Sequence, residues 1–177
     1  MEREIPLSSE TTFEGRLIRV RVDTVRLPDG RLRRREVVEH PGAVAVLPAL
    51  PSGEIVLVRQ YRHAVGRILL EVPAGTREPD EPPEACARRE LLEETGYEAG
   101  ALRELARFYV SPGWASEELI VFLATDLVAR QARPADDERI AVERVAPEQV
   151  PELLRRRDIA DAKTLIAVLG YLGLRLV

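Results

Sequence analysis

Residues 75–97 read GTREPDEPPEACARRELLEETGY, and this stretch decides the fold. Two prolines stand where the first turn of a helix tolerates them, good helix formers follow, and Gly96 stands at the expected stop. The stretch therefore predicts a helix over Pro82–Thr95. At about 100° per residue, Glu90, Glu93 and Glu94 share one ridge of this helix, at the border of its apolar face.

Three carboxylates on one ridge are unfavourable by themselves. Like charges three or four residues apart destabilise a helix by roughly a few tenths of a kcal/mol per pair, so a compensating cation is expected. Carboxylate oxygens suit Mg²⁺ or Mn²⁺, and no cysteine or histidine pair lies nearby to favour zinc. The alternative is a solvated acidic helix in which Arg88 and Arg89 pair with their neighbours.

The same stretch fits a longer pattern: Gly, five residues, Glu, seven residues, then Arg-Glu-U-x-Glu-Glu-x-Gly-U, where U is a bulky apolar residue. The matching positions are Gly75, Glu81, Arg89, Glu90, Leu91, Glu93, Glu94, Gly96 and Tyr97. With this composition, such a match arises by chance with a probability of roughly one in 10⁵ or less. On these residues the chain resembles the Nudix hydrolases, which hydrolyse a nucleoside diphosphate linked to another group.

The resemblance implies a divalent-cation site, with Mg²⁺ as the expected ion and Mn²⁺ as the alternative. The implied ligands are Glu90, Glu93, Glu94 and the carbonyl oxygen of Ala74. Arg89 and Glu81 would orient the acids. Positive charge there would neutralise a pyrophosphate and make water a usable nucleophile at neutral pH.

Four further stretches resemble the ADP-ribose pyrophosphatase branch of this family. They are RRREVVEH at 33–40, VRQYR at 58–62, SPGWASE at 111–117 and IADAKTL at 159–165. The substrate-binding residues that they imply are Arg34, Glu36, Arg62, Pro112, Gly113, Trp114 and Glu117. The implied reaction is Mg²⁺-dependent hydrolysis of ADP-ribose to AMP and ribose 5-phosphate. For the Pro-Gly loop the alternative is an ordinary turn, with the tryptophan as a packing lid.

The catalytic base is expected in the acidic segment Asp136-Asp137-Glu138. Glu138 aligns best with the glutamate that this branch is thought to use on the attacking water. The alternative is a solvated acidic turn.

The rest of the chain predicts strands before, between and after helices. The expected strands are Ala43–Leu50, Glu54–Gln60, Ile68–Val72, Leu105–Val110, Leu119–Thr125 and Ile140–Val145. Further helices are expected near Pro147–Arg156 and over Asp161–Leu174. This order predicts an α+β fold with a mixed sheet, and the resemblance implies a Nudix-type α/β/α sandwich.

Ahead of this region, Phe13–His40 predicts two strands around Pro28-Asp29-Gly30, which would form a small N-terminal antiparallel sheet. Two domains are therefore expected, an N-terminal sheet over residues 1–40 and a Nudix hydrolase domain over residues 41–177. The resemblance also implies a homodimer with the N-terminal sheet in its interface.

The composition of the chain limits the classes of partner that it is expected to bind. The 26 basic and 30 acidic residues give a net charge of −4, which offers no general attraction to nucleic acid or anionic lipid. With no apolar run of roughly 20 residues and no apolar N-terminal signal core, a soluble cytoplasmic protein with a small nucleotide-sugar substrate is expected. One lysine among the basic residues, no asparagine and 13 prolines suggest a thermophile as the source.

Three alternatives stay open. The same fold could act on FAD, a GDP-sugar or a nucleoside triphosphate. A non-catalytic Nudix domain could sense ADP-ribose, although the acids of the motif are intact. The acidic helix could also be purely structural, in a protein that works through interactions.

Overall fold

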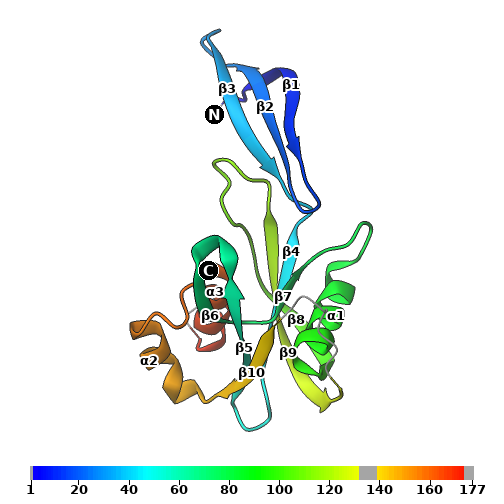
Figure 1. Cartoon of the computed structure of the whole chain (residues 1–177), viewed down its shortest axis with the longest axis vertical. Helices are drawn as coiled ribbons and strands as arrows, with labels where there is room; N and C mark the ends of the chain where they lie inside the picture. Colours follow the sequence, from blue (N-terminus) through cyan, green and yellow to red (C-terminus); the bar gives the residue numbers. More distant parts are fainter. Residues whose placement is uncertain (1, 132–138, 174–177) are drawn as a thin grey trace. The chain divides into compact units, whose positions relative to one another are not determined.

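The computed structural model describes residues 2–131 and 139–173. The chain divides into two compact units (Figure 1). One comprises Met1–Gly42 with Tyr109–Glu118, and the other comprises Ala43–Phe108 with Leu119–Val177. Among the described helices, none has the length and apolar character needed to span a membrane.

The first unit contains an antiparallel sheet in the order β1-β2-β3. Its strands are β1 (Ile5–Glu14), β2 (Arg19–Arg26) and β3 (Leu32–Glu39). The turn between β2 and β3 is the predicted one, with Gly30 at φ 85° and the Asp29 carboxylate accepting from the Arg31 amide at 3.0 Å. The sequence predicts two strands here, and β1 is a third. All ten of its residues are exposed, so its IPLSSETTFE sequence carries little of the alternation that marks a half-buried strand.

A four-stranded mixed sheet in the order β7-β4-β9-β8 forms the centre of the second unit. Its strands are β4 (Ala43–Pro48), β7 (Ala74–Thr76), β8 (Tyr97–Tyr109) and β9 (Glu118–Ala129). β4 pairs antiparallel with β7 and parallel with β9, so both of its edges are covered. Every residue of β4 is buried, as its continuous apolar sequence predicts.

A second sheet of three antiparallel strands has the order β10-β5-β6. Its strands are β5 (Ile55–Arg62), β6 (Arg67–Glu71) and β10 (Ile140–Val145), and a 3₁₀ turn, η1 (His63–Val65), joins β5 to β6. The C-terminal part of the chain continues through a 3₁₀ turn, η2 (Pro147–Gln149), into α2 (Val150–Arg155) and then α3 (Ala162–Tyr171).

Helices cover the two faces of β4, with α1 (Pro83–Thr95) on one side and α3 on the other (Figure 1). Val44 and Val46 belong to the apolar cluster that contains Ala87 and Leu91 of α1. The alternate residues of β4 belong to the cluster that contains Ala167 and Val168 of α3. This two-residue alternation produces a layered helix-sheet-helix core, which confirms the expected α+β fold with a mixed sheet.

The motif helix begins and ends close to where the sequence predicts. Pro82 is the extended residue before the helix, and Pro83 occupies its first position. At the other end Gly96 adopts φ 72°, and its amide donates to the Leu92 carbonyl at 2.9 Å. Proline at the start and left-handed glycine after the last turn are the residues that helix geometry favours at these places.

Candidate active site

Two motif glutamates are buried against β7. α1 packs Ala87 and Leu91 into the apolar core, and this orientation places Glu90 and Glu94 at the edge of the core, where they are 9% and 4% exposed. The Glu94 Oε2 accepts a hydrogen bond from the Ala74 amide at 3.2 Å. The helix ridge predicted from the 3.6-residue period therefore faces the backbone of residues 74–76.

Gly75 gives the Glu90 carboxylate its space. A Cβ atom built on Gly75 would lie 1.9 Å from Oε1 of Glu90 and 2.0 Å from its Cδ, far inside van der Waals contact. Gly75 does not adopt a left-handed φ, so the need for glycine is steric and comes from this close approach. The glycine of the motif is thus explained by the glutamate that lies over it.

Arg89 balances the negative charge of the ridge. Its guanidinium contacts Glu81 at 2.9 Å, Glu90 at 2.6 Å and Glu93 at 3.3 Å. The hydrogen bond from Arg89 is the main cause that lowers the pKa of the Glu81 carboxyl to about 2, against the opposing effect of burial. Glu81 is therefore ionised at neutral pH and anchors Arg89, which in turn holds the carboxylates of Glu90 and Glu93.

These residues fit a divalent cation in their chemistry. Glu90, Glu94 and the half-exposed Glu93 offer hard carboxylate oxygens, and the close approach at Gly75 leaves the Glu90 carboxylate directly on the β7 backbone. Over residues 2–131 and 139–173, however, no three acidic, histidine or cysteine side chains already converge on a common point as ligands. In this geometry the Arg89 guanidinium pairs with Glu90, and the Ala74 amide donates a hydrogen bond to Glu94.

Next to this ridge lies a buried network of charged side chains. Glu71, at the end of β6, has a side chain only 1% exposed and contacts Arg62 at 2.7 Å and Lys163 at 2.6 Å. Lys163 also contacts Asp161 at 2.9 Å. Burial raises the pKa of the Glu71 carboxyl, but the hydrogen bonds from Arg62 and the charge of Lys163 outweigh it, so the pKa lies below its ordinary value of 4.5.

Replacing this carboxylate should destabilise the fold in a pH-dependent way. Because the folded-state pKa of Glu71 is lowered, its stabilising effect is complete above pH 4.5 and is lost as the pH falls below that value. We expect Glu71→Gln to lower the free energy of unfolding at pH 7 by on the order of 3 kcal/mol, because two cations lose their partner.

Urea unfolding of both proteins at pH 7 and pH 3 measures this effect, and the difference between them should shrink at the lower pH. The control is Glu104→Gln, which removes an exposed pair with Arg107 and should cost less than about 1 kcal/mol. A difference between wild type and Glu71→Gln that stays constant with pH would contradict the assignment.

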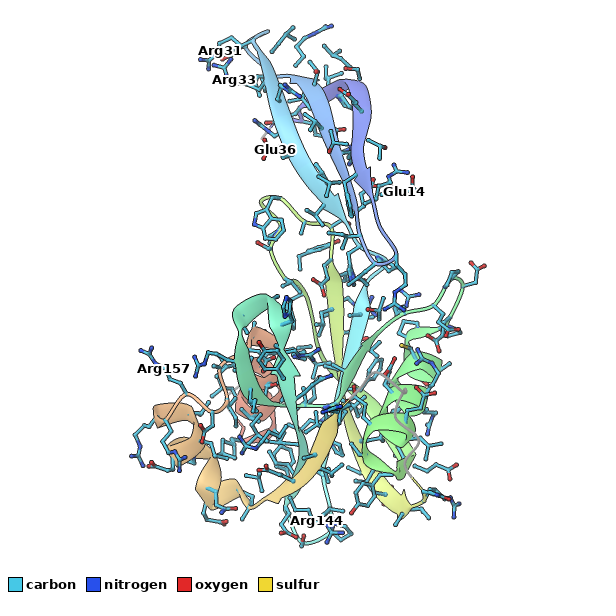
Figure 2. All side chains as sticks on the ribbon, in the orientation of Figure 1. Glu14, Arg31, Arg33, Glu36, Arg144 and Arg157 are labelled. Atoms are coloured by element: carbon cyan, nitrogen blue, oxygen red, sulfur yellow. The ribbon has the colours of Figure 1, made fainter. Side chains whose placement is uncertain are left out.

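A hollow of about 440 Å³ in the first unit brings together four of the predicted substrate residues. Glu36, Pro112, Gly113 and Trp114 line it, and Figure 2 shows Glu36 on β3. The loop is held to β3 through its backbone: the Val38 amide donates to the Trp114 carbonyl at 2.8 Å, and the Ser116 amide donates to the Val38 carbonyl at 2.9 Å.

The other predicted site residues lie elsewhere. Arg34 is exposed on β3, and Glu117 ends the loop, where its carbonyl accepts from the Val110 amide at 3.0 Å. Arg62 lies at the end of β5, in the second unit, and is paired with Glu71. The candidate base Glu138, with Asp136 and Asp137, lies outside the described residues.

The buried network was missed by reasoning from the sequence. Glu71 and Lys163 are separated by 92 residues, and no local pattern links them. One signal was available: Glu71 stands within the otherwise apolar strand expected over Ile68–Val72, and an acidic residue there needs a partner if the strand is buried.

Two family models match this chain, one in its N-terminal part and one over most of the rest. The model of the NUDIX domain matches residues 39–168, and the model of the nucleoside diphosphate sugar hydrolase N-terminal domain matches residues 4–38. An ADP-ribose pyrophosphatase of Bacillus subtilis (strain 168) is 44% identical over 174 residues, which cover 97% of this chain and 94% of that protein. A methanol dehydrogenase activator of Bacillus methanolicus is 38% identical with the same coverage of both chains.

Among solved structures, a crystal structure of an ADP compounds hydrolase superposes with a TM-score of 0.87, covering 98% of this chain and 95% of that one. The sequence identity is 23%, so this likeness supports the fold. The domain match includes all of the residues from Gly75 to Tyr97 on which the resemblance was based. With the match extending over most of its length, the chain belongs to the Nudix family.

Proposed function

We propose that this protein hydrolyses the pyrophosphate bond of ADP-ribose, giving AMP and ribose 5-phosphate, with Mg²⁺ as its ion. The observation that carries the proposal is the burial of Glu90 and Glu94 against β7, at the place where the family motif requires its acids. The similarity to the ADP-ribose pyrophosphatase of Bacillus subtilis supports the choice of substrate.

Nudix hydrolases generally use divalent metal ions, and Glu90, Glu93, Glu94 and the Ala74 carbonyl are the proposed ligands here. When bound, such an ion supplies positive charge to the pyrophosphate and makes water more acidic. Arg89 holds the Glu90 carboxylate at 2.6 Å and is itself held by Glu81, so the ligands are supported by a second layer of charged contacts. Glu138 is the proposed base for the attacking water.

Two groups of residues are proposed as substrate-binding residues: Arg62 in the second unit, and the residues of the hollow in the first unit. The Arg62 guanidinium is suited to bind a phosphate oxygen, because it is always charged and because the pair with Glu71 holds it in position. Trp114 is 57% exposed and offers a flat apolar face to a base or sugar, while Glu36 can accept hydrogen bonds from hydroxyl groups. Arg34, Pro112, Gly113 and Glu117 complete the proposed set of substrate-binding residues.

The N-terminal sheet, residues 1–40, is proposed to form the interface of a homodimer, with residues 41–177 as the catalytic domain. Large apolar side chains of this sheet are more than half exposed in the single chain, among them Ile5, Phe13 and Leu32. Sedimentation velocity tests the dimer, and a protein that stays monomeric at micromolar concentration would remove this part of the proposal.

Product analysis tests the substrate. We expect AMP and ribose 5-phosphate in equal amounts from ADP-ribose with MgCl₂, less product from FAD and GDP-mannose at equal concentration, and none with EDTA. Faster hydrolysis of FAD or GDP-mannose would replace the proposed substrate within the same reaction class. Binding of ADP-ribose without turnover in either Mg²⁺ or Mn²⁺ would favour the sensing function.

A further inference from the structure

Lys163 is the only lysine in the chain, although 26 residues are lysine or arginine. Its side chain is 14% exposed, and its ammonium lies 2.6 Å from Glu71 Oε2 and 2.9 Å from Asp161 Oδ1. A guanidinium is planar and larger, whereas an ammonium is a compact charge that can stand between two carboxylates. All other lysine or arginine positions of the chain are arginine, so the smaller cation is used at position 163 alone.

The carboxylate that Lys163 contacts is the one that holds Arg62. The Arg62 Nε and Nη2 lie 3.1 Å and 2.7 Å from Glu71 Oε2, the same oxygen that Lys163 contacts. Glu71 is 1% exposed, so water contributes little to keeping its charge and orientation. The two cations do this instead, and removing one leaves the carboxylate less well balanced.

The first turn of α3 fixes the position of Lys163. Asp161 precedes the helix and its Oδ1 accepts from the Thr164 amide at 3.1 Å, as well as from Lys163. The Thr164 hydroxyl oxygen in turn accepts from the Val72 amide at 3.0 Å, next to Glu71. The start of α3 is therefore joined to Glu71, the last residue of β6, and to Val72, which follows the strand.

We propose that Lys163 is a positioning residue, whose ammonium fixes Glu71 so that Arg62 keeps one orientation beside the acidic helix. Three residues separate Glu71 from Gly75, where the Glu90 carboxylate lies. The negative charge of Glu94 also acts on Arg62. For its kinetic consequence this inference rests on the proposed function, since Arg62 is there a phosphate-binding residue.

A double-mutant cycle tests whether Lys163 acts through Arg62. We expect Lys163→Met to raise KM for ADP-ribose about tenfold with kcat within about threefold of wild type, and Lys163→Arg to recover part of the loss. In an Arg62→Gln background, Lys163→Met should have no further effect, because the residue that it positions is already absent.

The matched control is Arg155→Met, which removes a cation from an exposed pair with Glu152 and should leave KM and kcat unchanged. If Lys163 were merely structural, Lys163→Met would lower kcat/KM by the same factor in both backgrounds. That result, or unchanged kinetics in a folded Lys163→Met protein, would overturn the inference.

A second measurement needs no substrate. Lysine labelled with ¹³C at Cε and ¹⁵N at Nζ gives a single side-chain signal in this protein, because the sequence has one lysine. We expect this signal to shift in Arg62→Gln and in Glu71→Gln, and not in Arg155→Met. If Arg62→Gln leaves the signal unchanged, the inference that Lys163 and Arg62 share one network through Glu71 is overturned. If the signal shifts but the protein shows no turnover, only the proposed function is overturned.

Discussion

Glu94→Gln is expected to lower kcat by about 10³-fold while the protein folds as before. Glu94 is 4% exposed, and one of its oxygens accepts from the Ala74 amide at 3.2 Å. Glutamine has nearly the same shape and can still accept this hydrogen bond, so no cavity forms. The substitution does remove the negative charge that a divalent cation requires. It should therefore impair cation binding and catalysis without affecting folding.

Steady-state kinetics, calorimetric titration with MgCl₂ and thermal unfolding measure these effects on the same preparation. Glu90→Gln should behave similarly. Glu84→Gln is the matched control, because Glu84 is exposed in the first turn of the same helix and lies off the motif ridge. A Glu94→Gln protein with near-normal kcat and unchanged Mg²⁺ affinity would remove Glu94 from the proposed ligands.

Gly75→Ala is expected to lower kcat about 100-fold with little loss of stability. The added methyl group would lie 1.9 Å from Glu90 Oε1, so the Glu90 carboxylate must move. This carboxylate is the far end of a flexible side chain, so the fold can adjust at small cost. A displacement of about 1 Å in a catalytic group is nevertheless enough for a loss of this size.

Gly113→Ala adds the same methyl group where nothing lies within 4 Å, and it serves as the control for thermal stability. A further variant, Gly75→Ala with Glu90→Asp, shortens the side chain and should restore any stability that Gly75→Ala loses. Gly75→Ala with wild-type kcat would show that the Glu90 carboxylate is not held as the structure describes.

The motif helix could be predicted from the sequence because its signals are local. Proline at its start, glycine after its end and the spacing of Ala87 and Leu91 each follow from helix geometry. The strands of the core were predictable for the same reason, since β4 is a continuous apolar run. The ridge of Glu90 and Glu94 then follows from 3.6 residues per turn.

What could not be predicted depends on partners distant in the sequence. β1 pairs with β2 through its backbone and buries none of its side chains, so its residues show no periodic pattern. β8 begins at Tyr97, eight residues before the expected strand, and five of those eight residues are exposed. The contact of Lys163 with Glu71 joins the start of α3 to the end of β6. No local sequence pattern predicts that these two ends lie close together.

The loop Tyr109–Glu118 belongs to the compact unit of Met1–Gly42, although the N-terminal family match ends at residue 38. The chain therefore passes between the units three times, after residues 42, 108 and 118. A gene truncated at the family boundary would strip the Trp114 loop of its backbone partner Val38. A fusion that transfers this sheet to another enzyme together with its partner loop must therefore include two separate segments of the chain.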